Sequence, residues 1–137
     1  MINIIYGAKG TGKTKQIIDR ANNSVENAKG NIVFLTDKRG YTYQISYAIR
    51  LIMMEEYELI SDFDFTGFIK GLIAGDSDIE HFFIDGLHRI CKKEIKELGE
   101  LFQTFEQIDE KYNIDFTLAI SLPREELPEF MLKYIKE

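Results

Sequence analysis

Short runs of apolar residues recur along the chain, and each run is bounded by glycine or polar residues. The runs lie at 2–6, 31–36, 80–85 and 116–120 and contain mainly Ile, Val, Leu and Phe. Continuous apolar runs of this length are typical of strands that are buried on both faces of a sheet. The pattern therefore predicts four buried strands.

Between these runs, apolar residues recur every three or four positions, which is the spacing of an amphipathic helix. This spacing predicts helices over residues 13 to about 23, 41 to about 56, 66 to 74, 87 to about 112, and from about 128 onward. Residues 57–65 are ambiguous, with either a minor strand at Leu59-Ile60 or a loop around Asp62 and Asp64. Strands and helices in this order predict a three-layer α/β/α domain with a small, mainly parallel sheet of about four to five strands.

Length and charge limit the classes of protein. The 137 residues, 45% of them apolar, predict a single domain over residues 1–137 with a substantial core. A net charge of −6 disfavours a general binder of nucleic acid or anionic membranes, because such binding depends on basic surface. The single cysteine, Cys91, excludes an internal disulfide and a cysteine-based zinc cluster. No signal-peptide pattern and no apolar run near the roughly 20 residues that span a bilayer is present, so we expect a cytoplasmic protein.

Residues 7–14 read GAKGTGKT and match the pattern G-x-x-x-x-G-K-[ST] at every fixed position. The match follows a predicted strand and opens a predicted helix. Glycines at 7, 10 and 12 allow successive backbone N–H groups to point at an anion, and the helix N-terminus adds its positive dipole. Lys13 can then reach the β- and γ-phosphates of a nucleotide, and the Thr14 hydroxyl can ligate Mg²⁺. A dinucleotide site is excluded, because Lys15 stands where its third glycine is required.

With this motif the chain resembles the P-loop NTPase superfamily, and the RecA-like and AAA-like ATPase branch is favoured. The resemblance implies a protein that binds a nucleoside triphosphate, ATP by default, together with Mg²⁺. The nucleotide-binding residues that it implies are Gly7, Ala8, Lys9, Gly10, Thr11, Gly12, Lys13, Thr14 and Lys15.

The superfamily also has a second motif, an apolar strand that ends in a metal-binding Asp. His81-Phe82-Phe83-Ile84-Asp85 and the run that ends at Asp37 both fit, and the spacing from the first motif favours Asp85. We therefore expect Thr14 and Asp85 to hold the metal, and Lys13 and Asp85 to be the catalytic residues. For Asp37, capping of a following helix is the simpler interpretation.

A glutamate that polarises the attacking water usually follows this Asp, but here the next residue is Gly86. Asp37 or His88 could orient the water instead. Further residues that follow predicted strands are candidates for contacts to phosphate or substrate, and these are Arg39, Arg89, Arg124 and the sensor-like Ser121.

Two other clusters have simpler structural explanations. Tyr41, Tyr43 and Tyr47 could stack on a base, but Tyr43 and Tyr47 have the spacing of helix packing, which we favour. The acidic segment 55–64 lacks the glycine and the terminal glutamate of a calcium loop and is interpreted as a solvated face.

Three functions remain open. The first is an Mg-dependent ATPase whose hydrolysis is weak or activated by a protein partner or by homo-oligomerisation. The second is a phosphotransferase similar to small nucleoside kinases, with its acceptor held by residues 40–79. The third is a nucleotide-dependent binding switch without hydrolysis.

Overall fold

The computed structural model describes residues 1–135 and contains one sheet of five parallel strands in the order β1-β5-β4-β2-β3. The strands are β1 (Ile2–Tyr6), β2 (Asn31–Thr36), β3 (Ile49–Met53), β4 (Ile79–Asp85) and β5 (Asp115–Ile120). The α-helices are α1 (Lys13–Ser24), α2 (Asp62–Gly75), α3 (Leu87–Cys91) and α4 (Gly99–Tyr112). Short 3₁₀ helices are η1 (Val25–Asn27), η2 (Thr42–Gln44), η3 (Met54–Tyr57), η4 (Ile95–Glu97), η5 (Arg124–Glu126) and η6 (Glu129–Tyr134). Within the described residues, every helix is too short or too polar to cross a bilayer.

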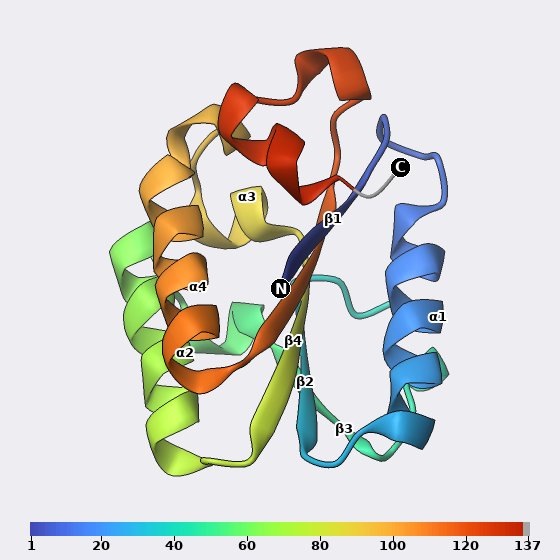
Figure 1. Cartoon of the computed structure of the whole chain (residues 1–137). Coiled ribbons are helices and arrows are strands. Elements are labelled where there is room, and N and C mark those ends of the chain that lie inside the picture. Colours follow the sequence, from blue (N-terminus) through green and yellow to red (C-terminus); the bar gives the residue numbers. More distant parts are fainter. Residues whose placement is uncertain (136–137) are drawn as a thin grey trace.

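Helices cover both faces of this sheet. Helix α1 lies on one face, and α2, α3 and α4 lie on the other (Figure 1). Successive side chains of a strand point to opposite faces, so Phe34 and Phe83 pack with α1, whereas Leu35 and Ile84 belong to the cluster on the other face. The sequence-based prediction of an α/β fold with strands buried on both faces is confirmed.

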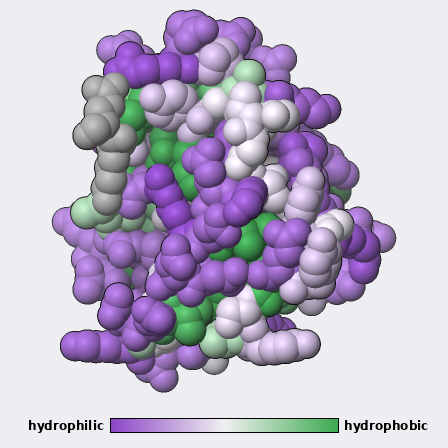
Figure 2. Space-filling model, turned by 90° about the vertical axis from the view of Figure 1, so that its right-hand side faces the viewer, coloured by the Kyte–Doolittle hydropathy of each residue, from purple (hydrophilic) through white to green (hydrophobic). Residues whose placement is uncertain are grey.

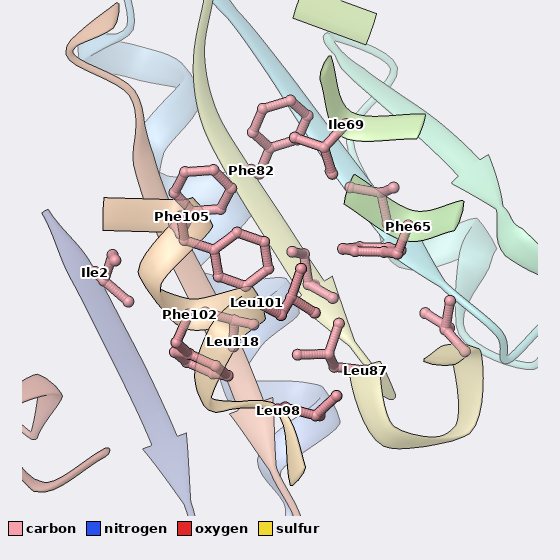
Figure 3. Close-up of a cluster of buried hydrophobic side chains, with 14 of the residues drawn as sticks. Ile2, Phe65, Ile69, Phe82, Leu87, Leu98, Leu101, Phe102, Phe105 and Leu118 are labelled. Carbon is pink, nitrogen blue, oxygen red and sulfur yellow. The ribbon is translucent and has the colours of Figure 1, made fainter. Parts of the chain in front are cut away.

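The larger hydrophobic core lies between the sheet and the α2–α4 side (Figure 3). Its centre is aromatic: the Phe105 ring centroid lies 4.6 Å from that of Phe116 and 5.4 Å from that of Phe102. All three side chains are at most 1% exposed. Complete burial of a side chain of this size contributes about 1.5–3 kcal/mol, so this cluster is a main source of stability.

The helix predicted for residues 41–56 is wrong. The segment instead forms the 3₁₀ turn η2, then the edge strand β3, and then η3. Strand β3 pairs in parallel with β2 and buries Ile49 and Ile52, while Arg50 between them is exposed. The apolar positions of this short edge strand imitate helical spacing, and only pairing with β2 distinguishes the two. The minor strand considered at Leu59-Ile60 is not formed.

The single long helix predicted from residue 87 to 112 is also wrong, because the chain breaks after α3. Lys92 adopts a left-handed backbone conformation with φ of 54°, which ends α3, and α4 begins only at Gly99. Next to the break, the Lys93 ammonium lies 2.9 Å from Oδ1 of the buried Asp62, at the start of α2. This ion pair ties the break to the neighbouring helix, which is a tertiary contact that local periodicity cannot reveal.

Helix α2 starts four residues earlier than predicted, at Asp62. The Ser61 side chain accepts a hydrogen bond from Asp64 N–H, and the Asp64 carboxylate accepts one from Ile60 N–H. These two hydrogen bonds cap the start of the helix. Asp62 is buried, so the interpretation of this acidic segment as entirely solvated is wrong. The helix predicted from about residue 128 is present as the 3₁₀ helix η6.

Candidate functional site

The first motif and Asp85 meet at the carboxyl ends of the strands. The pleat of β4 places Asp85 on the same face as Phe83, which is the face that α1 covers. The first turn of α1 carries Thr14, whose hydroxyl donates a hydrogen bond of 3.1 Å to Asp85 Oδ2. These two residues are 71 positions apart in the sequence. The two residues that were expected to hold the metal are therefore in contact, and their role in metal binding stays a prediction.

The loop between β1 and α1 has the backbone that its glycines allow. Gly10 and Gly12 have φ of 85° and 86°, in the left-handed region that favours glycine. At Gly7, an added Cβ would lie 2.6 Å from Thr11 Oγ1, so a larger residue would displace the Thr11 side chain. Ala8, Lys9, Gly10, Thr11 and Gly12 are all exposed. The loop thus faces solvent beside the start of α1, whose first N–H groups have no partner within the helix.

Lys13 is the buried cation of this loop. Its side chain is 6% exposed, and its ammonium donates a hydrogen bond of 2.8 Å to the Ala8 carbonyl oxygen. Burial lowers the pKa of Lys13, the charge of Asp85 opposes that effect, and the nearby cations Lys38 and Arg89 lower the pKa further. An anion bound here would reduce the cost of placing three cations near one another.

Asp37 lies at the end of β2 and is held by Arg89 of α3. The guanidinium donates a hydrogen bond from Nε to Oδ2 at 2.6 Å and another from Nη2 to Oδ1 at 3.0 Å, so the ion pair is bidentate. This pair crosses directly over Gly86: an added Cβ there would lie 2.4 Å from Asp37 Oδ1 and 2.6 Å from Arg89 Nη2. Gly86 also has φ of 91°. The space next to Asp85 that a glutamate side chain would need is therefore filled by the carboxylate of the neighbouring strand.

The Asp37–Arg89 pair is the feature that the sequence analysis missed. Asp37 was interpreted as a helix cap, but the 3₁₀ helix that follows it has no side-chain cap. Glycine in place of the usual glutamate was the available signal, because a glycine between a strand and a helix indicates a close approach by another group. Arg89 contributes to this site, whereas Arg39 is exposed and pairs with Glu55 and Glu56.

The remaining candidates lie around this centre. Ser121 and His88 both line a pocket of about 490 Å³ that Asp37 does not line, and burial lowers the pKa of His88. Lys15 is exposed and its ammonium pairs with Asp19 at 2.9 Å, so its side chain lies outside the loop. Arg124 is exposed at the start of η5.

The three tyrosines lie in the segment that crosses the α1 face between β2 and β3. Tyr43 and Tyr47 are 82% and 108% exposed, so the preferred interpretation that they pack in the manner of a helix face is wrong. Tyr41 lines a small hollow together with Thr14 and Asp85. Most of the α1 face is hydrophilic, and its hydrophobic side chains form small, separate areas (Figure 2).

Thr14 and Asp85 offer two oxygen donors, the type of donor that Mg²⁺, Ca²⁺ and Mn²⁺ share. Among residues 1–135, no group of three or more His, Cys, Asp or Glu side chains is arranged to hold a metal ion. Mg²⁺ does not need such a group, because it is usually bound by one or two protein oxygens together with phosphate oxygens and water. A hydroxyl and a carboxylate 3.1 Å apart, beside the exposed glycine-rich loop of residues 8–12, fit that requirement.

The strand–loop–helix arrangement of residues 2–24 in an all-parallel sheet is compatible with a P-loop fold. No protein-family model matches the chain, and a search of curated proteins found no match.

Proposed function

We propose that this protein binds a nucleoside triphosphate with Mg²⁺, ATP by preference, and hydrolyses it slowly or on activation by a protein partner. The observation that carries the proposal is the hydrogen bond between Thr14 and Asp85, which joins the end of β4 to the loop of residues 7–14. The nearby cations Lys13, Lys38 and Arg89 outnumber the carboxylates Asp37 and Asp85 beside them, so the site is locally positive in a protein of net charge −6, as a polyphosphate requires.

Each residue of this group has a role in the proposal. The backbone N–H groups of the loop and of the first turn of α1 bind the phosphates. Lys13 moves from the Ala8 carbonyl to the β- and γ-phosphates, and Thr14 and Asp85 hold the Mg²⁺ directly or through water. Bound there, Mg²⁺ would stabilise the negative charge of the terminal phosphate, and Lys13, Thr14 and Asp85 would hold that phosphate and the metal in position.

Asp37 is the carboxylate that we assign to the attacking water. It lies one residue beyond Thr36, which is aligned with Asp85 across β2 and β4. The water oxygen bonds to the γ-phosphorus, the bond from that phosphorus to the β,γ-bridging oxygen breaks, and the released electron pair stays on ADP. The water proton passes to Asp37 and then to solvent or phosphate. Because Arg89 occupies both oxygens of Asp37, hydrolysis without a partner is expected to be slow.

Binding is tested first, by calorimetry and thermal melting with Mg·ATP. At a hundred times the dissociation constant, a ligand of the folded state stabilises it by about 2.7 kcal/mol. For a chain of this size that is a rise in Tm on the order of 10 °C. Lys13→Ala should remove most of this rise, whereas Lys29→Ala, an exposed lysine outside the site, should leave it intact. Equal rises in both variants would contradict the assignment of the loop.

Turnover is tested next, by following phosphate release from ATP. Slow release that Asp37→Asn abolishes while binding persists supports hydrolysis through Asp37. Binding without any release over hours favours the nucleotide-dependent switch, the alternative that the missing glutamate supports. The sequence has no identified motif for guanine recognition, so ATP should bind better than GTP in a competition experiment.

A further inference from the structure

A second pocket lies on the β2 and β3 side of the metal-binding edge, which we define as the carboxyl ends of β4 and β2 with Asp85, Thr14 and Asp37. Its volume is about 550 Å³, within the range of small-molecule sites. Its lining has an apolar part and a charged part, formed by Met54, Leu59, Ile60 and Ile90 and by Asp37, Glu55, Glu58, Arg89 and Lys92.

The Asp37–Arg89 ion pair belongs to both this pocket and the site described above. Asp37 is the next residue after Thr36, which is aligned with Asp85, and the pair passes over Gly86. Thr14 and Asp85 are the residues that would hold Mg²⁺, which would stabilise the charge of the phosphates, so the terminal phosphate belongs at the Asp85 end of the site. The pocket therefore lies next to the place of the terminal phosphate, which is the group that would be transferred.

We propose that this pocket binds the acceptor of the terminal phosphate, and that the acceptor is an uncharged or cationic alcohol with an apolar ring, of about the size of a nucleoside. This proposal rests on Mg·ATP binding at residues 7–14. It makes slow hydrolysis the reaction that occurs when water takes the place of the alcohol.

The charges of the lining select this chemical class. The pocket is lined by three carboxylates and two cations, and Arg39 pairs with one of these carboxylates, so an anionic acceptor would gain no net attraction there. Two of the carboxylates are already paired, Asp37 with Arg89 and Glu55 with Arg39. Glu58 is exposed and has no hydrogen bond or ion pair with any of residues 1–135, so it can accept a hydrogen bond from a hydroxyl or an ammonium.

The apolar part of the lining gives the ring a place to bind. Met54 and Ile90 are 3% and 6% exposed and form a fixed floor, whereas Ile60 at the rim is 71% exposed. A flat ring that covered Ile60 would remove apolar surface from water, which is worth about 25 cal/mol per Å². In this proposal the exposed Ile60 side chain binds the ring of the acceptor.

The reaction is balanced with the groups present. The acceptor hydroxyl oxygen bonds to the γ-phosphorus, the bond to the β,γ-bridging oxygen breaks, and ADP leaves with the electron pair. The hydroxyl proton passes to Asp37, which lies where the pocket meets the metal-binding edge. For this transfer Arg89 turns from one oxygen of Asp37 toward the incoming phosphate, which frees that oxygen for the proton.

The test uses the full chain, Mg·ATP labelled in its γ-phosphate, and a panel of alcohols with rings: four nucleosides, pyridoxine and the cationic alcohol thiamine. The variant Ile60→Arg fills the rim with a charged side chain, and Phe63→Arg is its matched control. Phe63 is 78% exposed, lies three residues away and does not line the pocket, so both variants should fold.

Support would be transfer of label to an alcohol of the panel, or at least a tenfold faster consumption of ATP in its presence. Ile60→Arg should lose at least 90% of that gain, and Phe63→Arg should keep it. Phosphorylated counterparts such as thymidine monophosphate should give no gain.

Two results would overturn the proposal in distinguishable ways. If the protein binds Mg·ATP but none of the panel accepts label or speeds consumption, the acceptor pocket is wrong and the nucleotide site stands. If Mg·ATP itself does not bind, the proposed function is wrong and the acceptor site falls with it. A gain that Ile60→Arg and Phe63→Arg reduce equally would place the acceptor elsewhere on the chain.

Discussion

The two faces of the sheet are built differently. On the face with α2, α3 and α4, a continuous aromatic and aliphatic cluster fills the space below three helices (Figure 3). On the face with α1, one helix and an irregular segment cover a smaller cluster, and Tyr43 and Tyr47 of that segment are exposed. The Thr14–Asp85 contact lies at the edge of this second face. The α2–α4 face therefore mainly stabilises the fold, whereas the α1 face positions polar groups at the carboxyl ends of the strands.

The largest effect is expected in the aromatic cluster. Phe105→Ala removes a fully buried ring that contacts Phe102 and Phe116 and should lower the free energy of unfolding by about 3–5 kcal/mol. Urea denaturation measures this loss, with the exposed Leu132→Ala as the control. The affinity of the folded protein for Mg·ATP should not change. A loss below about 1 kcal/mol would show that the α2–α4 face is not the main source of stability.

A smaller effect, dependent on pH, is expected from the α1 face. His81 stacks on Phe83 and forms a 2.8 Å hydrogen bond with the Thr117 hydroxyl, and burial lowers its pKa from 6.5 to about 4. Between these two pKa values His81 is protonated in the unfolded chain but neutral in the folded chain. The free energy of unfolding is therefore highest above pH 6.5 and falls as the pH drops toward 4. The full shift corresponds to at most about 3 kcal/mol. Urea midpoints between pH 7 and pH 4 measure it, and His81→Gln should flatten the curve in this range.

The ion pair between Asp62 and Lys93 should act at lower pH. The Lys93 ammonium lowers the pKa of Asp62, so the stabilisation is present above the ordinary value of 3.8 and is lost as the pH falls through the lower folded value. Asp62→Asn should destabilise the protein at pH 7 by less than Phe105→Ala does, and the difference from wild type should shrink below pH 3.8. The exposed Asp64→Asn variant is the comparison: it removes a neighbouring negative charge, keeps an oxygen that can accept the Ile60 N–H, and leaves Lys93 paired with Asp62. A constant difference at all pH values would contradict the role of the charge.

The smallest effect is expected at the exposed tyrosines. Tyr47→Ser removes a ring that is 108% exposed and should change the free energy of unfolding by less than about 0.5 kcal/mol. Tyr41→Ser, in the hollow with Thr14 and Asp85, should alter Mg·ATP affinity more than Tyr47→Ser does. Calorimetry on both variants decides this. Equal affinities would show that the irregular segment does not contribute to the site.

Four strands and α1 could be predicted because their signals are local. Residues 2–6, 31–36, 80–85 and 116–120 are continuous apolar runs that only a sheet covered on both faces can bury. In contrast, strand β3 and the break at Lys92 depend on partners distant in the sequence. The strand requires β2 beside it, and the break stands next to the contact between Lys93 and Asp62.

The candidate site divides in the same way. The glycines at 7, 10 and 12 and the Lys13-Thr14 pair are recognisable from their order alone, because the turn and the helix start that they form are local. Asp85 could be preferred over Asp37 only by analogy, and it is the pleat of β4 that turns Asp85 toward α1, where it accepts a hydrogen bond from Thr14. The ion pair of Asp37 with Arg89 above Gly86 spans 52 positions and has no local signal except the glycine itself.

By itself, the order of the amino acids determined which segments are apolar on both sides and where the backbone can turn tightly, since these depend on neighbours a few residues away. Folding in three dimensions decided which charged groups meet at the carboxyl ends of the strands. Those meetings depend on the strand order β1-β5-β4-β2-β3, which brings β2 and β4 together across 42 intervening residues, from 37 to 78. The electrostatic energy of a pair depends on separation in space rather than along the chain, and only the packed sheet fixes that separation.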